Sequence, residues 1–139
     1  MALPHAFTVT IESSQLWLDE VLDELRTDDR ELAYAALRAV LHTLRDRLPI
    51  GEAADLAAQL PMLLRGLYFE GWRPAHQSKP LRDRDAFLRR VAAEMKRSEI
   101  GPEEAVRAVF HLLASRVAPG EIADVVGSMP QSFETLWPD

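Results

Sequence analysis

The chain of 139 residues contains no cysteine and no long uninterrupted apolar run. Without cysteine it can form no disulfide, no thiolate metal site and no cysteine nucleophile. The charges of Asp55 and Arg65 bracket the longest apolar run, which stays short of the roughly 18 to 20 residues that a membrane span needs. The N-terminal stretch also lacks the basic and apolar regions of a signal peptide. We therefore expect a soluble, cytoplasmic protein with no membrane segment.

Sequence motifs for catalysis and for phosphate binding are missing as well. The chain has no GxSxG, P-loop, GxGxxG or HExxH pattern, and its carboxylates cluster on predicted helix caps and solvated faces rather than in acid/base pairs. We assign no catalytic residue, no metal ligand and no cofactor from the sequence. The pattern leaves enzymatic activity open and favours a non-enzymatic role.

Apolar residues, 47% of the chain, recur at helical spacing almost throughout. Strand-like alternation occurs only over residues 7–11, where we expect an extended arm. Prolines and glycines divide the rest, because proline fits the first turn of a helix but not its interior. This spacing predicts helices over about 13–26, 29–47, 52–60 and 61–70, a loop after Gly71, and further helices from about residue 83.

The second half of the chain repeats the first at a shift of 69 residues. The shift gives 12 identities over the 31 positions 38–68, where average composition would give roughly two. We predict an all-α single domain over 1–139, a compact bundle of about eight helices. Its two multi-helix units, about 13–71 and 83–137, are joined by a loop over 72–82. A pseudo-twofold axis between them would bury Tyr68 and Trp137 near the contact, and a continuous helical stack remains the alternative.

Two stretches carry a resemblance to a known family. LRAVLHTLRDRLPIGEAADLAAQLPMLLRGLYFEGWRP, followed later by RAVFHLLASRVAPGEIADVVGSMP, resembles the bacterial family called domain of unknown function 2267. The resemblance extends from about residue 10 to 137, and GEAxDLAxQLP and LYFEGW are its most specific parts. It implies a small, cytoplasmic, all-helical protein, and it implies no activity, cofactor or catalytic residue.

The net charge of −6 is unevenly distributed along the chain. Residues 1–72 sum to −6, residues 73–97 to +5 and residues 98–139 to −5. The basic middle could bind an acidic partner, or it could neutralise its own flanks when the chain folds. One aromatic residue and several cations make this stretch the candidate interaction site. Its members are Trp72, Arg73, Lys79, Arg82 and Arg84.

Two further sets of polar residues recur in both units. His42 and His111 occupy equivalent positions, so a twofold could bring them together to share a metal ion or a proton. An arginine near the end of each long helix could bond the last carbonyls of that helix and a carboxylate of the next. We interpret this second set as a structural clasp. It consists of Arg47, Glu52 and Asp55 in the first unit and Arg116, Glu121 and Asp124 in the second.

These observations favour a cytoplasmic helical protein that acts in protein–protein interaction or regulation. The partner is unidentified, and further copies of the same chain are among the candidates. A sequence pI of 5.2 disfavours nucleic acid as the partner. The alternative is a small ligand or metal ion, with or without catalysis, in a pocket between the units beside His42 and His111.

Overall fold

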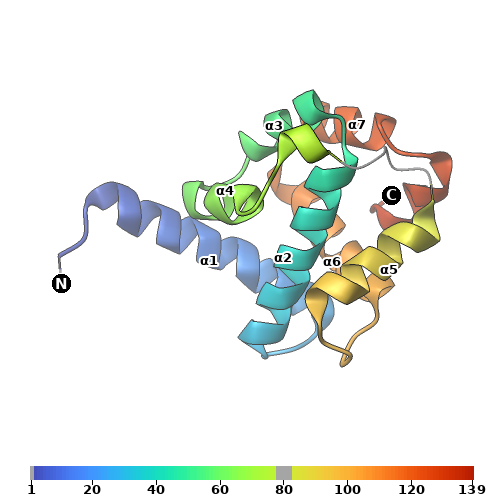
Figure 1. The fold of residues 1–139 in the computed structure, drawn as a ribbon. Helices are drawn as coiled ribbons and strands as arrows, with labels where there is room; N and C mark the ends of the chain where they lie inside the picture. Colours follow the sequence, from blue (N-terminus) through green and yellow to red (C-terminus); the bar gives the residue numbers. More distant parts are fainter. Residues whose placement is uncertain (1, 78–82) are drawn as a thin grey trace.

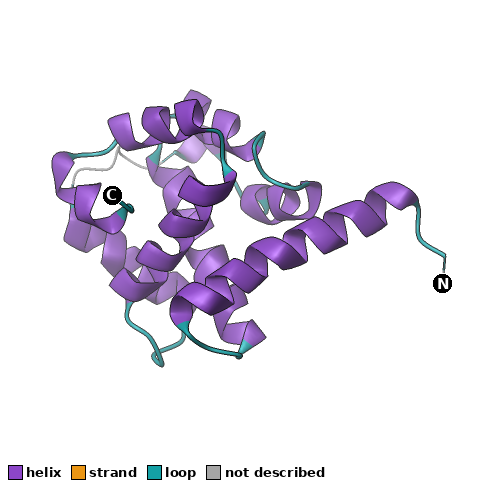
Figure 2. Cartoon of the chain, turned by 180° about the vertical axis from the view of Figure 1, so that it is seen from behind, coloured by secondary structure: helices purple, strands orange, loops and turns teal. Residues whose placement is uncertain are grey.

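The computed structural model describes residues 2–77 and 83–139. In these residues it contains seven α-helices, two short 3-10 helices and no strand (Figure 2). The all-α prediction is therefore confirmed. The elements are α1 (His5–Leu25), α2 (Arg30–Arg47), α3 (Ile50–Ala57), α4 (Met62–Phe69), η1 (Pro74–His76), α5 (Arg84–Met95), α6 (Pro102–Arg116), α7 (Pro119–Gly127) and η2 (Gln131–Leu136).

Local signals account for most helix boundaries. The side chain of Asp29 caps α2 by accepting from the Leu32 amide at 3.1 Å. Pro49 and Pro61 stand immediately before α3 and α4, where a proline ends the preceding segment without interrupting the new helix. At the end of α1, Arg26 adopts the left-handed conformation with φ 55°, which is a common way to terminate a helix.

The expected extended arm over residues 7–11 is wrong, because α1 begins at His5 and continues without a break to Leu25. Five alternating residues are too few to separate a strand from a helix by periodicity alone. Phe7, Ile11 and Leu18 also follow helical spacing, and they line one side of a groove against α4. The hydroxyl of Thr10 accepts from the Leu63 amide at 2.8 Å, which ties this first half of α1 to α4.

One hydrophobic core takes side chains from both halves of the chain. The long helices α2 and α6 contact each other. The first helix of each half also packs against the long helix of the other half, α1 on α6 and α5 on α2 (Figure 1). The short helices α3 and α7 also lie against each other at one end of the bundle. This exchange of contacts accompanies the sequence duplication, while the twofold relation between the units stays a prediction.

The two aromatic residues that the duplication aligns are both buried. Tyr68 donates its hydroxyl to the Ala53 carbonyl at 2.8 Å, within the first unit. Trp137 stacks on Phe110 at a ring-centroid distance of 4.1 Å, within the second. In the described part of the chain, no helix has both the length and the apolar character needed to cross a membrane.

Candidate functional site

The predicted interaction stretch is engaged with the protein itself where the structure describes it. Trp72 is half-buried, stacks on Phe69 at 5.3 Å and donates its indole N–H to Gln77 at 3.0 Å. Arg84 donates to Glu103 at 2.7 Å and so links α5 to α6. Arg73 is exposed and has no hydrogen-bond partner among the described residues. The two remaining members, Lys79 and Arg82, lie outside the described residues.

The two histidines have different surroundings. His42 is buried, and its Nε2 donates to the Leu67 carbonyl at 2.7 Å. Burial lowers the pKa of His42 below its usual 6.5, and the nearby guanidinium of Arg45 lowers it further. His111 is partly exposed, with Nδ1 3.4 Å from a carboxylate oxygen of Glu24 on α1. The histidines therefore hold separate contacts, and neither bonds to the other.

The predicted clasp does not form in either unit. The side chain of Arg47 forms no hydrogen bond or ion pair with a described residue, Glu52 and Asp55 included. Arg116 donates to Glu20 at 2.5 Å, a residue of α1 rather than of α7. A helical wheel places an arginine on a face, but it does not say which neighbouring helix covers that face, and this determined the outcome in both units.

A different arginine, Arg45, holds the end of α4. Its side chain is buried and donates to the carbonyls of Tyr68 and Glu70, each at 2.6 Å. Gln77 completes the same junction by donating to the carbonyls of Arg45 and Leu48 at 2.6 and 2.9 Å. Sequence reasoning missed Arg45 because its counterpart at the shift of 69 is Ala114, so the duplication does not mark it.

The carboxylates of the predicted clasp meet each other instead. Glu52 on α3, with Glu121 and Asp124 on α7, places carboxylate oxygens within 4.8 Å of one another. One oxygen of Glu52 and one of Glu121 are buried without a hydrogen-bond partner among the described residues. Glu52 and Glu121 are equivalent positions of the two units, so the duplicated residues that come together are these glutamates and not the histidines.

This proximity perturbs the acidity of Glu121. Its pKa is raised from the usual 4.5 to about 7, first because burial disfavours the charged carboxylate, and then because Glu52, Asp55 and Asp124 add negative charge nearby. Two carboxyl groups so placed are stable when they share one proton. The arrangement therefore favours holding a proton between α3 and α7.

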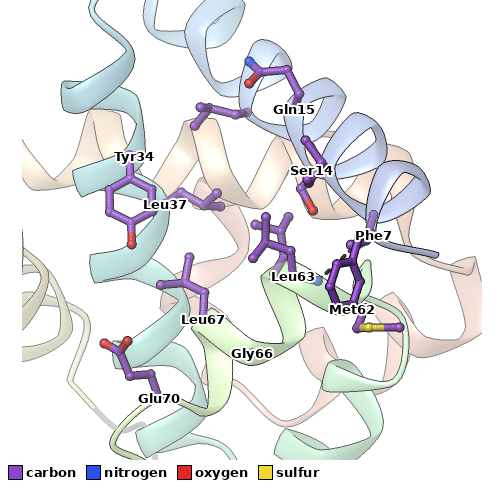
Figure 3. A pocket seen from close by; sticks show the side chains of 14 residues that line it. Phe7, Ser14, Gln15, Tyr34, Leu37, Met62, Leu63, Gly66, Leu67 and Glu70 are labelled. Atoms are coloured by element: carbon purple, nitrogen blue, oxygen red, sulfur yellow. Dashed lines mark hydrogen bonds between the residues drawn. The ribbon is translucent and has the colours of Figure 1, made fainter. Parts of the chain in front are cut away.

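An apolar groove of about 750 Å³ lies between α1, α2 and α4. The first half of α1 projects beyond the rest of the bundle and forms one wall (Figure 1). Helix α4 forms the opposite wall, and Tyr34 and Leu37 of α2 close one end (Figure 3). Among the lining residues Glu70 alone carries a charge.

Large apolar side chains are exposed along this groove. Phe7 is 53% exposed, Met62 56% and Leu63 53%, while Ile11 and Tyr34 are more than two-fifths exposed. These five account for half of the large hydrophobic residues exposed in the described part of the chain. Single exposed apolar residues are ordinary, but a contiguous set around a hollow is typical of a binding surface. The groove is therefore the candidate functional site.

The family model for uncharacterized conserved proteins named DUF2267 matches residues 14–136, which is most of the chain. The chain belongs to the DUF2267 family. The resemblance seen in its sequence is thereby confirmed. No curated protein matches the chain. The groove of this DUF2267 protein extends beyond the matched residues, since Phe7, Thr10 and Ile11 precede them.

Sequence reasoning on this DUF2267 chain predicted α2, α4 and the second half of α1, but it missed the first half of α1 and therefore the groove. The one usable signal lay in the duplication. At the shift of 69, Met62 and Leu63 correspond to Gln131 and Ser132, which are polar. Tyr34 likewise corresponds to an acidic residue, Glu103. Apolar side chains at these positions are thus a property of the first unit alone.

Proposed function

We propose that this protein acts by binding another protein, without catalysing a reaction itself, and that the groove between α1, α2 and α4 is its docking surface. The observation that carries the proposal is the contiguous row of exposed apolar side chains around a hollow of about 750 Å³. Grooves of this kind receive the apolar face of a helix, with anchor residues spaced one turn apart. A cytoplasmic, regulatory role forms part of the same proposal.

The duplication supports a binding role over a structural one. Corresponding segments of both units contribute to the core, and the second unit has the polar Gln131 and Ser132 where the first has Met62 and Leu63. The exposed Met62 and Leu63 therefore contribute little to the stability of the bundle. Leaving them in water costs roughly 25 cal/mol per Å² of apolar surface, a free energy that a partner recovers when it covers them.

The basic stretch after Gly71 is a weaker docking candidate. Arg84 already pairs with Glu103, and Trp72 already stacks on Phe69. A partner would have to displace these contacts before it could use either side chain. The groove needs no such displacement, because its side chains already face solvent.

Quantitative affinity capture with three baits tests the proposal. Leu63→Glu places a charge in the groove, and Ile50→Glu places the same charge on an apolar residue of α3 outside it. The two side chains are matched, being 53% and 47% exposed. We expect proteins enriched by the unmodified bait to be lost with Leu63→Glu and retained with Ile50→Glu. If every enriched protein survives Leu63→Glu, the groove is not the docking surface.

A further inference from the structure

We infer that the occupant of the groove is a second copy of this chain, bound about a twofold axis so that the first half of each α1 lies in the groove of the other copy. The inference rests on the proposed function, since it names the partner for the same surface. It follows from the charge, the shape and the helix propensity of the first half of α1.

The first half of α1 and the groove form a nearly uncharged face on an acidic protein. Residues 6–18 contain a single ionisable side chain, Glu12, although 27% of the whole chain is charged. Glu70 is the only charged residue among those that line the groove, and Arg38 partly neutralises it at 3.0 Å. Two copies of net charge −6 repel each other over most of their surface. At this face two copies can approach without strong electrostatic repulsion.

The same face carries both a ridge and a hollow. Phe7 and Ile11 form the ridge, since they lie one turn apart on α1 and are 53% and 47% exposed. The hollow that they border is lined on its other side by Met62 and Leu63. Figure 3 shows Phe7 beside Met62 and Leu63. A twofold axis through the groove inserts the ridge of each copy into the hollow of the other, which makes one closed, self-complementary contact. The eight residues of α4 span roughly 12 Å, enough to receive about two turns of helix.

The electrostatics of this arrangement are favourable at the ends of the groove. A twofold axis perpendicular to α1 runs the second copy's α1 antiparallel to the first, so its N-terminal end lies toward Tyr34 and Glu70, at the other end of the groove from Phe7 and Met62 (Figure 3). The N-terminus of a helix carries a partial positive charge, which the carboxylate of Glu70 stabilises.

The first half of α1 has a low intrinsic helix propensity, which favours a partner that packs against it. Thr8, Val9, Thr10 and Ile11 are β-branched, and such residues form helices less readily than alanine or leucine. Helical segments of this length are marginal in water unless tertiary packing supports them. Within one chain α4 covers only one side of this segment. A second copy in the groove supplies the missing packing along the exposed Phe7 and Ile11.

Sedimentation equilibrium of the full chain over micromolar concentrations tests the inference, with Ile11→Glu and Val9→Glu as a matched pair. Ile11 is 47% exposed and lines the groove, whereas Val9 is 48% exposed and does not line it. Glutamate forms helices more readily than either residue, so neither variant melts α1, and circular dichroism checks this. We expect a dimer whose dissociation constant rises at least about tenfold in Ile11→Glu and changes less than about twofold in Val9→Glu.

Three results would overturn the inference. They are a wild-type chain that stays monomeric over the whole range, equal dissociation of both variants, and a native mass spectrum showing a monomer with an added organic mass. The affinity-capture experiment remains separate. If the wild-type chain is a monomer and Leu63→Glu still abolishes capture of a different protein, self-association is refuted. The proposed docking function then stands.

Discussion

Replacing Glu121 by glutamine should stabilise the protein at about pH 8 and leave its stability at about pH 4 almost unchanged. In the native state Glu121 faces Glu52 on α3, with Asp55 and Asp124 close by, and its raised pKa of about 7 reflects burial and that negative charge. A glutamine side chain at this position would be uncharged at every pH. Its amide can also donate a hydrogen bond to the carboxylate of Glu52.

The sign of this stability change follows from the coupling between proton binding and folding. The pKa of Glu121 is raised on folding, so the native state holds its proton more tightly than the unfolded chain. The stability due to this proton is complete below pH 4.5 and is lost as the pH rises through about 7. A difference between 4.5 and about 7 corresponds to roughly 3 kcal/mol. Partial solvent exposure screens the charges and reduces this to about 1–2 kcal/mol.

Urea unfolding at several pH values measures the effect directly. We expect the free energy of unfolding of Glu121→Gln to exceed that of wild type by about 1–2 kcal/mol at pH 8, or roughly 3–6 °C in Tm. Glu52→Gln should also raise the stability at about pH 8, because it removes a neighbouring negative charge that raises the pKa of Glu121. Glu12→Gln, at an exposed site on α1, serves as the control and should change little.

The reasoning fails if Glu121→Gln is no more stable than wild type at pH 8. It also fails if the gain is the same at pH 4 and pH 8, because a pH-independent gain would come from packing rather than from the proton.

Three further outcomes follow from the contacts near the end of α2. Arg45→Ala should lower the free energy of unfolding by about 3 kcal/mol, because it leaves the buried Tyr68 carbonyl and the part-buried Glu70 carbonyl without their donor. Arg47→Ala should change the free energy of unfolding by less than about 0.5 kcal/mol, and equal losses in urea unfolding would contradict this. Gln77→Ala should cost about 1–2 kcal/mol in the same assay, because two carbonyls at the end of α2 lose their donor, and an unchanged midpoint would count against that role. The ring of His42 should titrate below pH 6.5 by NMR, with stability falling as the pH drops below that value; a midpoint at or above 6.5 would show that its burial is relieved in solution.

The sequence predicted helices well because their signals are local. Apolar spacing, the cap at Asp29 and the prolines at positions 49 and 61 act within a few residues, and the structure follows them. The start of α1 was missed because residues 7–11 satisfy both periodicities. Contact with α4, including the hydrogen bond that the Leu63 amide donates to the Thr10 hydroxyl, supports the helical form. That contact joins residues 53 positions apart, and no local pattern contains it.

Site residues were harder to predict because their roles depend on which helices are neighbours. Glu52 and Glu121 were recognised as a repeated pair, but each was assigned to an arginine of its own unit. The contact between α3 and α7 brings them to each other instead. Arg45 carried no sequence signal, since an arginine at the polar edge of a helix is ordinary until α4 covers it.

The two units differ in sequence and structure at the groove. This difference distinguishes residues that stabilise the fold, which both units share, from residues that we propose to bind a partner, which only the first unit has. The second unit has a twelve-residue α5 in place of the 21-residue α1, and the six-residue η2 in place of α4. In η2 the large apolar residues Phe133 and Leu136 are buried, whereas α4 leaves Met62 and Leu63 exposed. Substitutions in the shared core should therefore lower stability in either unit, while polar substitutions at Met62 or Leu63 should weaken binding and leave the unfolding midpoint nearly unchanged. A large loss of stability from Leu63→Ser, the residue that the second unit carries at this position, would show that the exposed row serves the fold after all.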